Sequence, residues 1–279
     1  MLKKKKGPEM FFQNAEAINK YYNQVPDIVE DCMNKLNFAV GRRYNLFDYT
    51  GPEDATDVIV VMGSGSYVCQ SASEILNQNY GRKTGVLNVR LFRPWSKKHF
   101  LEALPSTVER IAVLDRCKEN GSIGEPLFTD VCTTLFSEPM SKPIKIIGGR
   151  YGIASKDFTP GMAIAVYENL ASPNSKVKFT VGIDDDVTNL SLPYENFDTL
   201  GHNVIQCQFW GFGSDGTVGA NKDAIKIIGD NTDLYGQAYF AYSAHKSRGI
   251  TTSHLRFGPE PIHAPYLITS SDYVAVHYP

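Results

Sequence analysis

The sequence has 279 residues, of which 42% are hydrophobic and 21% are charged, and its formal net charge is −2. This balance is typical of a folded globular protein with a sizeable core, and it excludes a disordered chain and a strongly basic nucleic-acid-binding surface. The five cysteines include no C-x-x-C pair, so we predict no disulfide framework, zinc site or iron–sulfur ligand run. No apolar run reaches the length of about 18 residues that a membrane-spanning helix needs.

Residues 1–50 are predicted to form a helical lead-in and a polar connector. The basic start of the chain is followed by Gly7-Pro8 rather than by an apolar stretch, so it does not resemble a secretory signal. From Ile28 to Val40 apolar residues recur at roughly helical spacing, and Gly41 is placed to end the helix.

From Asp57 onward short apolar runs alternate with helical segments, which is the pattern of a parallel sheet with helical crossovers. We therefore assign residues 51–190 to one α/β domain with a mostly parallel five-stranded sheet and flanking helices. Thr159 is placed to cap the last helix of this domain. The expected strands cover residues 58–62, 86–91, 110–115, 144–148 and 176–183. The expected helices cover residues 67–79, 94–104, 124–136 and 160–170.

After a polar linker, residues 191–279 are predicted to form part of a second α/β domain. A strand at 203–210, a helix at 217–228 and a strand at 235–242 make a βαβ unit. The remaining length is too short to close a doubly wound domain, so we expect this one to be truncated. Further candidate strands lie around residues 251–255, 266–268 and 273–277.

A glycine-rich loop lies between the first strand and the helix of this second unit. Gly211, Gly213 and Gly216 form a G-x-G-x-x-G string. Glycines at these positions allow a tight turn and a close approach of the backbone, and the helix N-terminus after them favours a phosphate. The string predicts a phosphate or pyrophosphate site, and the alternative is a tight turn that binds nothing.

The end of the next strand distinguishes between nucleotide classes. A NAD site needs an acidic residue there, but residues 243–249 are basic, and Asp230 and Asp233 fall in the turn before the strand. Lys246 and Arg248 favour an additional phosphate, as in NADP or at the 3′ position of coenzyme A. The alternative interpretation of these two residues is a solvated loop.

Polar residues also follow the strands of the first domain at their carboxyl ends, where parallel sheets meet their ligands. Arg116 and Glu125 are predicted to contact a neighbouring domain or to pair with each other. We favour an interface over catalysis here, and we assign no catalytic residue and no metal ligand.

Several long strings in the chain resemble pyruvate:ferredoxin oxidoreductase, and together they extend along nearly its whole length. The strings are AVLDR (112–116) with GEPL (124–127), GGRYG (148–152) with KDFTP (156–160), GSDGTVGANK (213–222) and SHLRFGP (253–259). The resemblance implies a module similar to the transketolase C-terminal domain up to about residue 190. From about residue 200 it implies the start of the gamma-type module, which in this family helps to bind coenzyme A.

The resemblance also implies the reaction of the parent enzyme, which is the oxidative decarboxylation of pyruvate with coenzyme A to acetyl-CoA and CO2. Electrons would pass to ferredoxin or flavodoxin. The modules for thiamine diphosphate and for the iron–sulfur clusters are not in this sequence, so the piece alone is expected to be inactive. The expected partners are the remaining modules of the enzyme, the electron acceptor and a second copy in a homodimer. The expected location is the cytoplasm, with a mitochondrion-like organelle as the alternative.

Carried over by position, the resemblance assigns five residues to a partial coenzyme A site. The chain departs from the family's pattern at His245, where a second lysine is usual, and at Arg248, where glycine is usual. Two other hypotheses stay open: a stand-alone NADP-binding Rossmann-like protein and a purely structural, dimer-forming module. The assigned residues are Gly213, Ser214, Gly216, Thr217 and Lys246.

Overall fold

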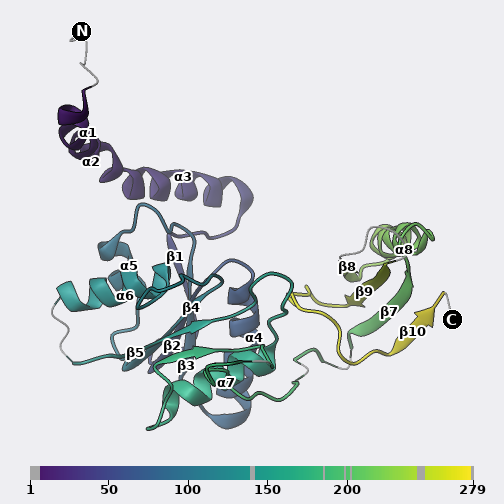
Figure 1. The fold of residues 1–279 in the computed structure, drawn as a ribbon. Helices are drawn as coiled ribbons and strands as arrows, with labels where there is room; N and C mark the ends of the chain where they lie inside the picture. Colours follow the sequence, from purple (N-terminus) through teal and green to yellow (C-terminus); the bar gives the residue numbers. More distant parts are fainter. Residues whose placement is uncertain are drawn as a thin grey trace.

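Two α/β units follow each other along the chain (Figure 1). The structure is a computed structural model, and it describes residues 7–138, 142–184, 186–197, 199–201, 203–243 and 249–277. The first unit contains a six-stranded sheet and the second a four-stranded sheet. The predicted fold class, a mostly parallel α/β sheet followed by a smaller α/β unit, is confirmed.

The chain begins with the expected helical lead-in, which consists of η1 (Pro8–Met10), α1 (Phe11–Ala17), α2 (Asn19–Tyr22) and α3 (Val25–Val40). The longest helix, α3, ends at Gly41, whose φ of 67° places it in the left-handed region that glycine adopts easily. Val29 and Met33 pack one side of α3 onto the core of the first unit. The helices before α3 point away from the sheet (Figure 1).

The first sheet has the strand order β1-β3-β2-β4-β5-β6. The expected five parallel strands are present, and one antiparallel strand, β1, pairs with β3 at the edge. We had placed residues 47–50 in the polar connector, and this assignment was wrong. The strand is only four residues long and ends in a turn signal, so two apolar positions were too few to reveal it. The bounds are β1 (Phe47–Thr50), β2 (Asp57–Met62), β3 (Thr84–Val89), β4 (Arg110–Asp115), β5 (Lys145–Arg150) and β6 (Lys178–Thr180).

Helices cover both faces of this sheet, and each face has its own apolar core. α4 (Gly65–Tyr80) and α7 (Pro160–Ala171) pack on one face. α5 (Lys97–Ala103) and α6 (Pro126–Ser137) pack on the other. The expected cap is not formed: Thr159 occupies the N-cap position of α7, but its hydroxyl is buried and has no hydrogen-bond partner among the described residues.

Two consecutive glycines in β5 let aromatic rings approach the sheet from both sides. A methyl group on Gly148 would lie 2.6 Å from the ring of Phe128, and one on Gly149 would lie 2.1 Å from the ring of Phe179. Carbon atoms that are not bonded repel each other at such distances. Both rings are packed against the sheet, so they cannot move away to make room. The glycine pair is therefore required by packing, since neither residue has a positive φ.

The second unit is a four-stranded sheet with the order β10-β7-β9-β8. The expected βαβ unit is formed by β7 (Ile205–Phe212), α8 (Thr217–Asn231) and β8 (Tyr235–Tyr242). β9 (Ile250–Gly258) lies antiparallel between β7 and β8, and β10 (Tyr273–Val276) adds to the outer edge of β7. Of the three further candidate strands two are confirmed, whereas residues 266–268 form no strand.

Residues 261–268 return to the first unit and connect the two sheets. Ala264 and Tyr266 are buried in the core that α4 and α7 share. The Asp157 carboxylate accepts a hydrogen bond of 2.9 Å from the backbone N–H of Leu267, and the ring of His263 stacks on Tyr67 with 5.1 Å between the ring centres. The second unit is thereby held against the first by the segment that follows β9.

Candidate functional site

The predicted phosphate-binding loop connects β7 to α8 (Figure 1). Two of its residues have left-handed backbone conformations, Ser214 with a φ of 75° and Gly216 with a φ of 88°. Glycine adopts this conformation freely, whereas a serine in it is strained. Gly211 is required for a different reason, because a methyl group there would lie 2.4 Å from the Asp215 carboxylate and 2.5 Å from the Thr217 hydroxyl.

The Asp215 carboxylate lies at the start of α8. It accepts hydrogen bonds of 2.8 Å from the backbone N–H groups of Phe212 and of Thr217. These bonds lower the pKa of Asp215, so the group is a stable anion at the positive end of the helix dipole. A phosphate that approached this helix end would meet a negative charge, and two of the amides that it would use are already engaged.

Thr217 lies beneath the loop rather than on its surface. The residue is buried, and its hydroxyl is 2.8 Å from Nδ1 of His277. Its backbone carbonyl accepts a further bond of 2.8 Å from the Asn221 side chain. We infer that Thr217 fixes the first turn of α8 against the end of β10 through its bond to His277.

The structure brings four of the five predicted site residues together in one loop. Ser214 and Gly216 are exposed and Gly213 is half-buried, so the loop presents open backbone to solvent above the buried Thr217. Lys246 lies outside the described residues. Sequence reasoning missed the role of Asp215, although an aspartate two residues before a helix is a known signal for such a turn.

The buried polar row of β9 is a second feature that sequence reasoning missed. Arg256 is only 1% exposed, and its guanidinium donates to the backbone carbonyls of Ala264 (3.2 Å) and Tyr266 (2.7 Å) and to the Gln206 side chain (3.0 Å). Two residues earlier on the strand, Nδ1 of His254 accepts a bond of 3.2 Å from the N–H of Ile268. Both side chains therefore hold the segment that joins the two units.

His254 is expected to make stability depend on pH. Burial, together with the charge of Arg256, lowers the pKa of His254 from 6.5 to about 4. Between these values the unfolded chain binds a proton that the folded chain does not, so the free energy of unfolding falls as pH falls from about 6.5 to about 4. In the His254→Gln variant the amide oxygen can still accept the Ile268 N–H, and this loss should disappear. Urea unfolding of both proteins at pH 7.5, 6, 5 and 4 measures the difference, and parallel pH curves would contradict the assignment.

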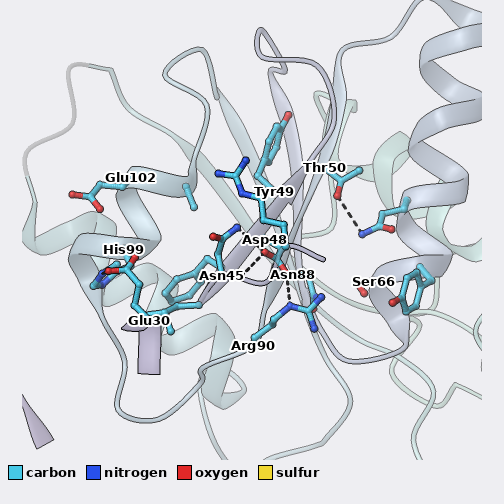
Figure 2. A pocket seen from close by; sticks show the side chains of 16 residues that line it. Glu30, Asn45, Asp48, Tyr49, Thr50, Ser66, Asn88, Arg90, His99 and Glu102 are labelled. Atoms are coloured by element: carbon cyan, nitrogen blue, oxygen red, sulfur yellow. Dashed lines mark hydrogen bonds and ion pairs between the residues drawn. The ribbon is translucent and has the colours of Figure 1, made fainter. Parts of the chain in front are cut away.

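A pocket of the described residues lies elsewhere, around the edge strand β1 (Figure 2). It has a volume of about 740 Å³ and is mostly polar. Asp48 forms an ion pair there with Arg90, and Glu30 lies 3.6 Å from Nε2 of His99. Oδ1 of Asn88 is buried there and has no partner among the described residues. None of the four predicted site residues that the structure describes lines this pocket.

The polar residues at the carboxyl ends of β4 and β5 have partners within the first unit. Glu125 forms an ion pair of 3.2 Å with Arg150, and Nε of Arg116 donates a bond of 2.7 Å to the backbone carbonyl of Gly152. The suggestion that Arg116 and Glu125 pair with each other was therefore wrong. Glu125 pairs with the last residue of β5, and Arg116 binds the backbone just after that strand.

The described part of the chain contains no group of three or more histidine, cysteine, aspartate or glutamate side chains that could hold a metal ion. Among the same residues, no helix combines the length and the apolar character that crossing a membrane requires.

Comparison with known families identifies each unit separately. Residues 55–157 match the family described as pyruvate:ferredoxin oxidoreductase core domain II. Residues 206–279 match the family described as pyruvate ferredoxin/flavodoxin oxidoreductase. The first match covers β2 to β5 of the first sheet, and the second covers nearly all of the second sheet.

Full-length relatives resemble the chain across both units. It is 52% identical over 273 residues to the pyruvate:ferredoxin oxidoreductase of Moorella thermoacetica, which covers 98% of the chain and 23% of that protein. It is 54% identical over 274 residues to a pyruvate dehydrogenase [NADP(+)] of Cryptosporidium parvum, which covers 97% of the chain and 14% of that protein. The pyruvate-flavodoxin oxidoreductase of a Nostoc species is 49% identical over 283 residues, with 97% and 24% covered.

The chain therefore belongs to the pyruvate:ferredoxin/flavodoxin oxidoreductase family, and it corresponds to one part of these enzymes. It spans a quarter or less of the length of the relatives named above. Among solved structures, a 2-oxoglutarate:ferredoxin oxidoreductase from Magnetococcus marinus with 2-oxoglutarate, coenzyme A and succinyl-CoA bound matches 47% of this chain and 20% of its own, with 23% identity and a TM-score of 0.31.

Proposed function

We propose that the chain works as part of an enzyme that oxidatively decarboxylates pyruvate with coenzyme A to acetyl-CoA and CO2. The identity of 52% across both units to a pyruvate:ferredoxin oxidoreductase is the observation that carries this proposal. Thiamine diphosphate and the iron–sulfur clusters would be bound by other parts of that enzyme. The acceptor would be ferredoxin or flavodoxin, and the stand-alone NADP-binding hypothesis gains no support from the relatives.

Within the parent enzyme, we propose that this part positions other modules rather than reacting itself. The exposed apolar surface of α1 to α3 supports an interface role, since Phe38 is 94% exposed, Phe11 75% and Phe12 71%. We propose that the chain consists of two modules. The first comprises residues 51–190 together with β1, and the second comprises residues 191–279. A homodimer of the parent and a cytoplasmic location remain predictions.

We propose further that the loop between β7 and α8 contributes part of the coenzyme A pocket. Its open backbone at Gly213 and Gly216 supports this role, because no side chain among the described residues covers either glycine. The Asp215 carboxylate constrains the pose: a phosphate is expected to bind beside the helix end rather than directly on it. Lys246 is the expected cationic partner of the phosphate.

A thermal-shift titration with coenzyme A tests this part of the proposal. Saturation to about 100 times the dissociation constant should add about 2.7 kcal/mol to stability, which would raise the Tm of a chain of this size by roughly 5 °C or more. Lys246→Ala should reduce the shift, whereas Asp215→Asn should enlarge it because a repelling charge is removed. Lys226→Ala, a change at an exposed lysine on α8, is the matched control and should leave the shift unchanged.

NADPH serves as the comparison ligand in the same assay. A shift with NADPH and none with coenzyme A would replace the coenzyme A assignment by the NADP hypothesis. An equal loss in Lys246→Ala and Lys226→Ala would show that binding is nonspecific.

A further inference from the structure

A smaller pocket opens at the carboxyl ends of β4, β5 and β6, on the edge of the first sheet. Its volume is about 320 Å³. Polar groups and apolar side chains line it together, and Ile153, Val181 and Ile183 supply part of the apolar wall. The carboxyl edge of a parallel sheet is the usual place for a ligand in this class of fold. None of the four described residues assigned to coenzyme A lies in this pocket.

The strand register places two polar side chains side by side on the floor of the pocket. Arg150 at the end of β5 is the register partner of Thr180 at the end of β6. Register partners point to the same face of a sheet, so the guanidinium and the hydroxyl lie on one side. The side chain of Arg150 is 15% exposed, and its ion pair with Glu125 holds it in place. A guanidinium held in this way is suited to bind a second planar anion.

The charges around the pocket favour an anion. Lys118, Arg150 and Lys156 line it, against one acidic residue, Asp186. The Asp186 carboxylate accepts bonds from the N–H and the hydroxyl of Thr188, at 3.0 and 2.8 Å, so its lone pairs are engaged within its own loop. Because Glu125 already neutralises Arg150, the two lysines against Asp186 leave an excess of one positive charge that a ligand can neutralise.

Thr180 supplies an independent observation that points to a ligand. The residue is 7% exposed and lines the pocket, and its Oγ1 has no hydrogen-bond partner among the described residues. A buried hydroxyl without a partner destabilises the fold, because it has lost its hydrogen bonds to water. A bound acceptor would remove that cost, because the hydroxyl can turn its hydrogen toward the pocket.

We propose that this pocket binds a small organic carboxylate with a short apolar chain. Arg150 and the Thr180 hydroxyl bind the carboxylate, and Lys118 and Lys156 complete the positive rim. Ile153 and Val181 contact the apolar chain. All of these side chains belong to this chain, so binding in this pocket does not depend on which reaction the parent enzyme performs.

Butyrate and butyramide form a matched pair of probes, since they share a shape and differ in charge. In a ¹H–¹⁵N correlation titration of the chain, butyrate is expected to shift the amides of Gly152 and Val181 with a Kd on the order of 1 mM, as suits so small a ligand. Butyramide is expected to leave these amides unshifted. The double variant Lys118→Ala/Lys156→Ala should weaken butyrate about tenfold, equivalent to about 1.4 kcal/mol.

Two further variants separate binding from folding effects. Thr180→Val keeps the shape of the side chain, removes the hydroxyl and should weaken butyrate without loss of the fold. Lys178→Ala changes an exposed lysine on the same strand outside the pocket and should leave the Kd unchanged. Equal shifts by butyramide, or an equal loss of affinity in Lys178→Ala, would overturn the proposal. Shifts of the same amides by inorganic phosphate but not by butyrate would overturn the carboxylate assignment.

Discussion

Replacement of Arg256 by methionine is expected to lower the free energy of unfolding by about 3–5 kcal/mol, because it removes several hydrogen bonds from a charged donor, each worth about 1.5–3 kcal/mol. The guanidinium is almost fully buried and donates to the carbonyls of Ala264 and Tyr266. Methionine fills much of the volume but donates no hydrogen bond, so both carbonyls would lose a charged donor inside the protein. The segment that joins the two units should therefore loosen first.

Urea unfolding gives the size of this effect, and hydrogen exchange at the Leu267 amide shows where it arises. Arg256→Lys keeps the charge but cannot reach several acceptors at once, so an intermediate loss is expected. Arg93→Met is the matched control, because Arg93 is 53% exposed and pairs only at the surface. A loss below about 1 kcal/mol in Arg256→Met would show that the buried arginine does not hold the segment.

The second large effect is expected at Phe179, which is fully buried in the core beneath α4 and α7. Phe179→Ala should cost about 3–5 kcal/mol, because the lost ring leaves a cavity. Gly149→Ala alone should cost about 1–3 kcal/mol, since the new methyl group overlaps the ring. Combined, the two changes should cost less than their sum, because the methyl group then enters the space that the ring has left.

Chemical denaturation of the two single variants and the double variant provides the complete cycle. A strictly additive result would mean that the strand moves away from the ring instead of overlapping it. Gly201→Ala is a suitable reference, because a methyl group there meets no neighbouring atom within 4 Å and Gly201 has no positive φ.

The parallel strands of the first sheet could be predicted because each is a nearly continuous apolar run. β2 shows this best: after Asp57 it consists of five apolar residues, four of them fully buried. β1 could not be predicted, since only Phe47 and Tyr49 give it an apolar face and its partner β3 lies some forty residues away along the chain. Pairing over that distance leaves no mark in the local sequence.

The loop before α8 was located correctly from its glycines, but its chemistry was only partly predictable. The glycine spacing indicated a tight turn, and Gly216 indeed has a left-handed conformation. The Asp215 carboxylate lies where a bound anion would otherwise lie, at the start of α8. This depends on the direction of one side chain, which the glycine spacing does not determine. Arg256 was likewise hidden, because an arginine within a strand usually indicates a solvent-facing position.

The return of residues 261–268 to the first unit has a consequence for synthesis on the ribosome. The core between α4 and α7 includes Ala264 and Tyr266, which are made long after β6, the last strand of that sheet. Until they emerge, the nascent first unit exposes an apolar surface that its own residues do not cover. Such a surface slows completion of the native contacts and attracts chaperones. The first unit therefore acquires its finished core only when most of the second has been translated.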